Sequence, residues 1–244
     1  MSSIDDRYRA QAVPMTPVSE TEAEPETRVT VAASKPRAGG LAWELLQTIV
    51  LTLAIFLGVR AVVQNFRVEG ASMEPTLETG QYLLISKAPY FHIENTPLAG
   101  LANFLPTTRQ GSIEYLFGGP QRGDIVVFKA PTQPDKDFIK RVIGLPGDSV
   151  LIKNGEVFVN GQPLNEPYIH FPASYTYPFN GQPETIPDGY YFVLGDNRPN
   201  SSDSHLGWNV PVDNFVGRAW VSYWPPTDWG MEPSGNQVQT YQDE

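Results

Sequence analysis

One apolar segment near the N-terminus most strongly limits how this chain can fold. Residues 41–63 read LAWELLQTIVLTLAIFLGVRAVV, and the run between Glu44 and Arg60 contains no charged residue. Long charged side chains at the ends of such a run can reach the membrane surface, so the segment attains the roughly 20 residues that a spanning helix needs. We therefore predict a transmembrane signal anchor over residues 41–63.

Two other interpretations of this segment are weaker. A cleavable signal peptide is disfavoured, because a long tail precedes the segment and no Ala-x-Ala-like site follows it. A buried amphipathic helix is the remaining alternative. The flanking charges say little about orientation, since Lys35 and Arg37 precede the segment while Arg60 and Arg67 follow it.

The rest of the chain predicts disordered ends around a mainly β domain. Residues 1–40 are rich in Pro, Glu, Thr, Ser and Ala and have no apolar period, so we expect a disordered tail. A second polar tail is expected over residues 231–244. Between them, over residues 64–230, short runs rich in Val, Ile and aromatic residues alternate with Gly, Pro and Asn. We expect strands at residues 82–86, 124–128, 138–143, 149–153, 156–160, 190–194 and 215–224.

Turn chemistry refines this prediction. Asn154-Gly155 separates two of the expected strands and favours a type I′ hairpin. Residues 88–121 and 161–188 contain many Gly and Pro residues without a period, so we expect loops or irregular ribbons there.

Composition excludes several classes of function. The formal net charge of −10 argues against a nucleic-acid-binding protein. The absence of cysteine excludes disulfides, thiolate nucleophiles and cysteine-ligated metals. The three histidines have no metal-ligand spacing, so we expect neither a metal nor another cofactor.

Three polar segments are candidates for carrying chemistry. The first, GASMEPTL over residues 70–77, surrounds Ser72 with small residues that leave room around its hydroxyl, and Pro75 restricts the turn that follows. Taken alone this pattern is weak, because most serines in such turns are structural.

The second segment combines RGDIVVF (residues 122–128) with DFIKRVIGLPGD (residues 137–148), where Lys140 and Arg141 interrupt an apolar strand pattern. Strand alternation puts the two cations on opposite faces, and both faces look apolar, so the pattern does not tell which cation is buried. Arginine stays protonated in proteins, whereas burial can lower the pKa of lysine by up to about 3–5 units and provide a neutral amine. The alternative is a lysine on an edge strand that reaches water.

The third segment, GDNRPNSSDSHLGW over residues 195–208, follows an expected strand. It is either an ordinary surface turn or a set of hydroxyls and carboxylates that orients a catalytic amine.

Together, in this order and behind an apolar anchor, the three segments resemble those of bacterial-type type I signal peptidases over roughly residues 41–225. The resemblance implies a serine endopeptidase with a signal-peptidase-like β-sheet and ribbon domain and a small inserted β subdomain at about residues 149–190. It would remove N-terminal signal peptides from exported preproteins by cutting after Ala-x-Ala-like sites.

The resemblance also implies roles for individual residues. Ser72 would be the nucleophile, with its backbone N–H as an oxyanion donor, and Lys140 the general base. Ser201 would orient the Lys140 amine, with support from Asp203. The pair of Arg141 and Asp196 would brace the site. Shallow pockets for small substrate residues would be lined by Val68, Gly70, Met73, Leu77, Phe138 and Ile139.

At three positions the sequence departs from the enterobacterial pattern. Gly70 stands where that pattern has a serine whose hydroxyl assists the oxyanion. Pro199 replaces an aspartate, and His205 replaces an arginine that forms a salt bridge with the aspartate corresponding to Asp203. These departures leave open what donates to the oxyanion and what pairs with Asp203.

The resemblance further implies a monomer whose partners are preprotein signal peptides and the lipid bilayer, with no nucleic acid. Its N-terminus would be cytoplasmic and its catalytic domain on the exported side, at the periplasmic face of the plasma membrane or in the thylakoid lumen. Trp208, Trp220 and Trp224 could lie at the membrane surface or in the core.

Three alternative functions remain. A histidine-dependent serine hydrolase lacks a suitably placed base, and a self-cleaving repressor would need a DNA-binding domain in place of the tail and anchor. A catalytically inactive membrane-tethered binding or scaffold protein of the same fold is the main alternative. Such a protein would need neither Ser72 nor Lys140.

Overall fold

The computed structural model describes residues 38–91 and 106–232. The two predicted tails lie largely outside these residues, as does His92. Residues 38–40, placed in the N-terminal tail by the sequence, are helical in the structure.

The apolar segment forms one helix, α1 (Ala38–Val62). Its stretch Ala42–Val62 has 21 residues and a mean hydropathy of 2.1. The most apolar 18 residues of this stretch are not buried within the structure. At about 1.5 Å per residue, such a stretch extends about 32 Å, close to the roughly 30 Å of a bilayer's hydrocarbon core. Length, composition and exposed apolar side chains therefore fit a membrane-spanning helix better than a buried one.

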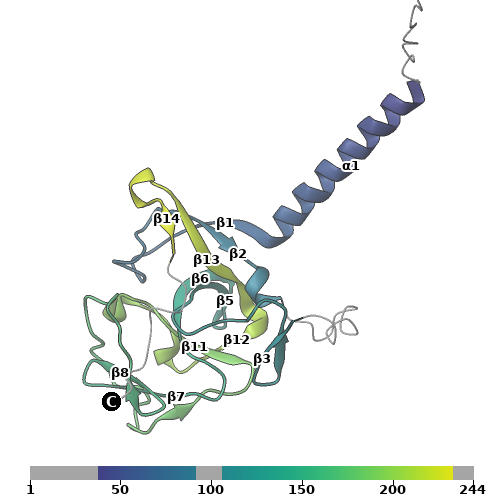
Figure 1. Ribbon diagram of the computed structural model, residues 1–244. Helices are drawn as coiled ribbons and strands as arrows, with labels where there is room; N and C mark the ends of the chain where they lie inside the picture. The colour runs from purple at the N-terminus through teal and green to yellow at the C-terminus, as the bar shows by residue number, and fades with distance from the viewer. Residues whose placement is uncertain (1–37, 92–105, 233–244) are drawn as a thin grey trace, which may run out of the picture. The chain divides into compact units, whose positions relative to one another are not determined.

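The larger sheet has eight strands, and each pair of neighbours is antiparallel. The strands are hydrogen-bonded in the order β1-β2-β13-β5-β6-β11-β12, and β14 pairs with β13. Figure 1 shows β5, β6 and β11 near the middle of this arrangement. The strands are β1 (Val63–Arg67), β2 (Tyr82–Ser86), β5 (Ile125–Ala130), β6 (Gln133–Gly144), β11 (Tyr190–Leu194), β12 (Val210–Pro211), β13 (Phe215–Trp224) and β14 (Gly230–Met231).

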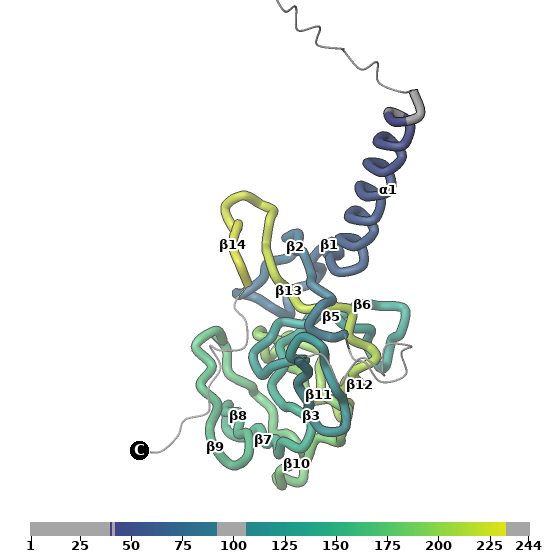
Figure 2. Tube along the Cα trace, turned by 45° about the vertical axis from the view of Figure 1, so that its right-hand side comes forward, coloured from purple at the N-terminus to yellow at the C-terminus, as the bar shows by residue number. Residues whose placement is uncertain are grey.

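A smaller four-stranded sheet lies within the predicted inserted subdomain. Its order is β10-β7-β8-β9, and Figure 2 shows these strands grouped together. Asn154 and Gly155 both have positive φ, 55° and 86°, as the predicted type I′ hairpin requires. The strands are β7 (Ser149–Lys153), β8 (Glu156–Val159), β9 (Gln162–Pro163) and β10 (Glu184–Thr185).

Short elements complete the domain. Strands β3 (Thr108–Gln110) and β4 (Ile113–Tyr115) form a separate hairpin. The described residues also form single turns of 3₁₀ helix at Ala88–Tyr90, Arg198–Asn200, Ser204–Leu206, Val212–Asn214 and Pro226–Asp228.

The prediction of a mainly β domain is confirmed. The longest strand segments that it missed are polar or charged, so they lack the apolar pattern on which the prediction relied. Strand β1, of sequence VQNFR, is short and polar. The first half of β6, QPDKD, is charged and exposed, yet it pairs with the end of β5. Short strands also lie in the segments predicted to be loops or irregular ribbons.

Both faces of the large sheet are covered, which explains the continuous apolar run in β5. Because side chains alternate along a strand, Val126 and Phe128 enter one core cluster while Ile125 and Val127 enter another. Trp208 is partly buried and packs against one of these clusters, with its ring centroid 6.3 Å from that of Phe128.

The register of the large sheet brings the three polar segments together. Strand β6 pairs with β5 on one side, where Lys140 faces Val126, and with β11 on the other, where Arg141 faces Leu194. Strand β11 ends at Leu194, so the loop from Gly195 onward begins beside the two cations. The turn that carries Ser72 connects β1 to β2.

Candidate active site

Ser72 lies in a turn that is fastened to the core on its inner side. Met73 and Leu77 are fully buried, and the Leu77 N–H donates to the Met73 carbonyl at 3.0 Å. Gly70 enters the turn with a φ of +86°, a conformation that glycine adopts without steric cost. The apolar side chains anchor the turn, and the Ser72 side chain stays half-exposed.

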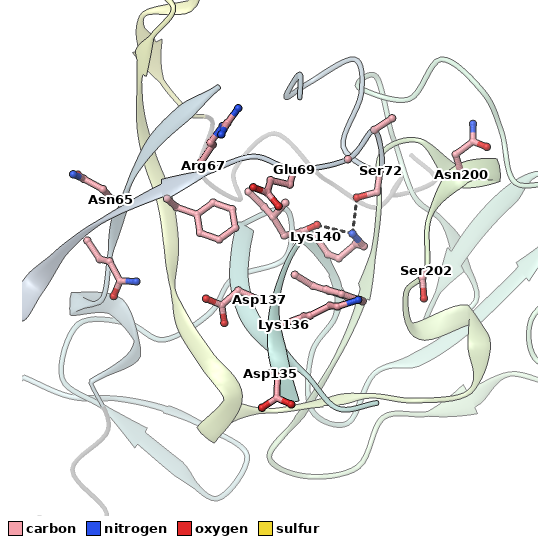
Figure 3. A pocket seen from close by; sticks show the side chains of 16 residues that line it. Asn65, Arg67, Glu69, Ser72, Asp135, Lys136, Asp137, Lys140, Asn200 and Ser202 are labelled. Atoms are coloured by element: carbon pink, nitrogen blue, oxygen red, sulfur yellow. Dashed lines mark hydrogen bonds between the residues drawn. The ribbon is translucent and has the colours of Figure 1, made fainter. Parts of the chain in front are cut away.

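Lys140 is buried inside the sheet with its amine directed at the serine. Its side chain extends from β6 and the residue is only 4% exposed. The amine donates to Ser72 Oγ at 2.6 Å and to the Ile139 carbonyl at 2.8 Å, and Figure 3 shows the two side chains meeting. The arrangement places a hydroxyl and an amine at hydrogen-bond distance, the separation that proton transfer between them requires.

The surroundings of Lys140 favour its neutral form. Burial lowers the pKa of the Lys140 amine from 10.5 to about 8, against the opposing effect of the carboxylates of Asp203 and Asp196. With a pKa of about 8, roughly one amine in ten is neutral at pH 7, whereas an exposed lysine is neutral about once in 2,500 molecules. Burial thus increases the supply of neutral amine by about two orders of magnitude.

Arg141, the next residue of β6, is buried as well, at 2% exposure, and pairs with Asp196. Its Nε donates to Asp196 Oδ1 at 2.9 Å and its Nη2 to Oδ2 at 2.7 Å. Asp196 also accepts a hydrogen bond of 2.6 Å from the hydroxyl of Thr76, four residues after Ser72. The turn with the serine and the strand with the lysine are therefore joined through one carboxylate.

The loop after β11 holds the main chain around Ser72. The Asn197 N–H donates to the Ser72 carbonyl, and its side-chain amide donates to the Ala71 carbonyl, each at 3.0 Å. Gly195 packs so closely that an added Cβ would lie 2.5 Å from the Ser72 carbonyl oxygen and 2.2 Å from Ser201 Oγ. A larger residue at position 195 would displace the backbone of Ser72.

Asp203, whose partner the sequence did not identify, contacts His205. His205 Nδ1 lies 2.6 Å from Asp203 Oδ1, and the other carboxylate oxygen accepts from the Gly195 N–H at 2.9 Å. Asp203 is completely buried. His205 thus provides the contact that the sequence comparison assigned to an arginine.

The predicted contact of Ser201 with the Lys140 amine is not among the hydrogen bonds of the described residues. Ser201 Oγ is buried against Gly195 and has no hydrogen-bond partner within residues 38–91 and 106–232. Its role in orienting the amine stays a prediction.

A groove runs past the two side chains and is shown in Figure 3. Three of the predicted pocket residues, Gly70, Phe138 and Ile139, line it. The other three, Val68, Met73 and Leu77, are buried in the core cluster that includes Ile139, and their part in substrate binding stays a prediction.

Sequence reasoning missed the rest of the groove. Its remaining walls come from β1, from the turn before Ser72, from the charged start of β6 and from the loop after β11. The only signal for β1 and for the start of β6 was their position beside residues already singled out, because neither of these two stretches has an apolar strand pattern. The additional lining residues are Gln64, Asn65, Phe66, Arg67, Glu69, Ala71, Asp135, Lys136, Asp137, Asn200 and Ser202.

Comparisons with known proteins show the family of the chain. The family model described as signal peptidase, peptidase S26, matches residues 42–224. Signal peptidase I of Leptolyngbya laminosa is 40% identical over 203 residues, which cover 80% of this chain and 85% of that protein. Probable signal peptidase I-2 of Synechocystis is 40% identical over 195 residues, covering 77% and 76%. The chloroplastic thylakoidal processing peptidase 1 of Arabidopsis thaliana is 33% identical over 177 residues, covering 68% of this chain and 44% of that protein.

The titration of Lys140 tests the electrostatics of the site. In the full chain in detergent, we expect the lysine ¹³Cε resonance that disappears in Lys140→Ala to titrate with a midpoint near 8, because burial disfavours the charged amine. In Asp203→Asn the midpoint should fall further, since a carboxylate that raises the Lys140 pKa is removed. A midpoint near about 10.4, usual for exposed lysines, would contradict the lowering of the Lys140 pKa by burial.

Proposed function

The chain belongs to the signal peptidase family, peptidase S26, and removes signal peptides from preproteins; we propose that it does so with Ser72 as nucleophile and Lys140 as general base. The observation that carries this proposal is the 2.6 Å contact between the buried Lys140 amine and the Ser72 hydroxyl. In its neutral form the amine accepts the hydroxyl proton, which makes the oxygen a stronger nucleophile.

The proposed reaction has two halves. Ser72 Oγ attacks the scissile carbonyl carbon while its proton passes to Lys140 Nζ, and a tetrahedral oxyanion forms. When the C–N bond breaks, the Lys140 ammonium returns the proton to the leaving amine of the mature protein, and the signal peptide remains as an ester on Ser72. Lys140 then takes a proton from water, which attacks the ester, and the serine regains its proton as the signal peptide leaves.

We assign the oxyanion to the backbone rather than to a side chain at position 70. Gly70 has no hydroxyl. The Ser72 N–H makes no hydrogen bond among the described residues, while the Ser72 carbonyl is held by the Asn197 N–H. A preorganised N–H donor of this kind stabilises the tetrahedral state without reorganising during the reaction.

Two alternatives find less support. His205 contacts Asp203 and stacks on Tyr175, so its position suits a supporting residue rather than the base for Ser72. The relatives are peptidases by name, and nothing among them favours the inactive scaffold.

Replacement of the two proposed catalytic residues tests the mechanism. With a preprotein that carries an Ala-x-Ala site, in detergent, Ser72→Ala and Lys140→Ala should each lower kcat/KM by at least about 10³-fold, because neither half of the dyad activates water alone. The wild-type kcat/KM should rise with pH with a midpoint near 8, where Lys140 becomes neutral. Lys129→Ala, an exposed lysine of the neighbouring strand, serves as the matched control. Activity that survives in a folded Lys140→Ala variant would place the base elsewhere.

We further propose that Phe138 and Ile139, with Gly70, restrict the substrate residues at the first and third positions before the cut to small side chains. Both side chains line the groove beside the dyad, so a larger substrate residue would meet them. Ile139 shares a core cluster with Val68, Met73 and Leu77, and this packing would hold its side chain rigid in the groove.

Ile139→Ala tests the pocket. The variant should cleave substrates with valine at one of these positions about tenfold better relative to alanine than the wild type does, because the three side-chain carbons that are removed leave room for the extra methyl groups of valine. Ile113→Ala is the matched control, since Ile113 is similarly buried at 6% exposure but lies in β4, outside the groove. An equal change of preference in both variants would mean that general loosening, rather than the groove, is responsible.

We propose that α1 crosses the membrane once, with residues 1–37 in the cytoplasm and a monomeric catalytic domain on the exported side. This side is where preproteins emerge, and the exposed Trp220 and Trp224 of β13 would suit a domain that works at a bilayer surface.

The absence of cysteine allows a direct test of this orientation. In intact bacterial cells with a permeable outer membrane, a membrane-impermeant maleimide should label Lys153→Cys, at the exposed end of β7. Ser19→Cys should be labelled only after the inner membrane is opened. Labelling of the opposite residue in intact cells would reverse the assigned topology.

A further inference from the structure

One segment of the small subdomain contacts three cationic or ionisable side chains, one in β6 and two in the loop after β11. The segment runs from Glu166 to Tyr175, between β9 and β10. It reaches Arg141, Arg198 and His205, each of which contacts a group beside the Ser–Lys pair. The roles assigned above to the catalytic residues make no use of this segment.

The first contact is between Tyr168 and Arg141. The guanidinium carbon lies 3.9 Å from the centroid of the Tyr168 ring, so the ring covers the guanidinium while its N–H groups bind Asp196 and the Gly123 carbonyl. A cation held over an aromatic face is stabilised in that position, more strongly when water is excluded. Because Arg141 follows Lys140 directly, this contact restrains the strand that carries the amine.

The second contact is an ion pair between Glu166 and Arg198, both nearly fully buried. Glu166 also accepts a hydrogen bond of 2.6 Å from the Tyr168 hydroxyl, and Arg198 Nε donates to the Gly195 carbonyl at 3.1 Å. Buried ion pairs contribute little net stability because of their desolvation cost, so a role in fixing geometry is the better explanation.

The third contact is the stacking of Tyr175 on His205, with ring centroids 4.0 Å apart and planes inclined by 17°. His205 contacts Asp203, and Asp203 accepts from the Gly195 N–H. Gly195 is therefore held through its carbonyl by the second contact and through its N–H by the third. It packs directly against the Ser72 carbonyl.

From this convergence we propose that the Glu166–Tyr175 segment positions the Ser–Lys pair, and that Tyr168 is a positioning residue that acts on Lys140 through Arg141. The inference rests on the proposed dyad and adds a residue from outside the three segments singled out in the sequence. The small subdomain is then part of the catalytic apparatus, although it lines none of the groove.

The proposal has an electrostatic consequence. The charged groups that act on Arg141 are Asp196, Glu166 and Glu232, and those that act on Lys140 are Asp203 and Asp196. Arg141 offsets the charge of Asp196 as long as the guanidinium stays in place. If the ring is lost and the guanidinium becomes mobile, Asp196 acts more strongly on Lys140 and favours the ammonium, so a higher pH is needed to form the base.

The test compares Tyr168→Leu with Tyr177→Leu in the full chain in detergent, with a preprotein substrate. Tyr177 lies in the core of the same subdomain and contacts Phe192 and Glu184, so its loss reports what weakening the subdomain alone does. Tyr168→Leu should lower kcat about tenfold with KM changed less than about twofold, and should move the acidic limb of kcat/KM to higher pH. Tyr177→Leu should lower the thermal midpoint and leave kcat per folded molecule and the pH limb unchanged.

Tyr168→Phe and Tyr168→Trp complete the series, because each keeps a ring over Arg141. Both should keep the wild-type position of the pH limb. The proposal is overturned if Tyr168→Leu matches Tyr177→Leu in kcat and pH profile, or if Tyr168→Phe is as impaired as Tyr168→Leu. Failure of the dyad itself would show separately, as activity that survives in Lys140→Ala.

Discussion

The structure depends on keeping the amine of Lys140 out of water while it touches the hydroxyl of Ser72. A buried ammonium is costly, so burial lowers the pKa of the Lys140 amine toward neutral pH, as the proposed general base requires. The central position of β6, between β5 and β11, provides the burial. The apolar anchors of the turn, Met73 and Leu77, bring the hydroxyl to the amine.

Two buried carboxylates, those of Asp203 and Asp196, raise the pKa of Lys140 and so oppose the effect of burial. Each carboxylate is also bound by another group. Arg141 binds Asp196 through two hydrogen bonds, and His205 and the Gly195 N–H bind Asp203. This explains why a lysine and an arginine are adjacent in an apolar strand: the lysine amine contacts the Ser72 hydroxyl, and the arginine pairs with the carboxylate that ties the serine turn to the strand. The carboxylates fix the geometry of the site, and they raise the pKa of Lys140 by less than burial lowers it.

The connection between membrane and site is short in the chain. Helix α1 ends at Val62, β1 begins at the next residue, and Ser72 follows in the turn after β1. Ten residues extend at most about 35 Å, so Ser72 must stay within that distance of the end of the helix. A protease that cuts preproteins as they leave a membrane is served by such a restraint. The edge strand β1 also lines the groove, so the same short segment links the apolar helix, one wall of the groove and Ser72.

Much of this protein follows from its sequence alone. Local composition and period predicted the apolar helix, most long strands and the Asn154-Gly155 hairpin, because these depend on neighbouring residues. The motifs around Ser72, Lys140 and Asp196 indicated which groups could react. Only the tertiary structure decided that Lys140 and Arg141 are both buried, that His205 pairs with Asp203, and that Tyr168 covers Arg141. The physical reason is that strand alternation tells which residues share a face, whereas burial and pairing depend on which distant segment packs against that face.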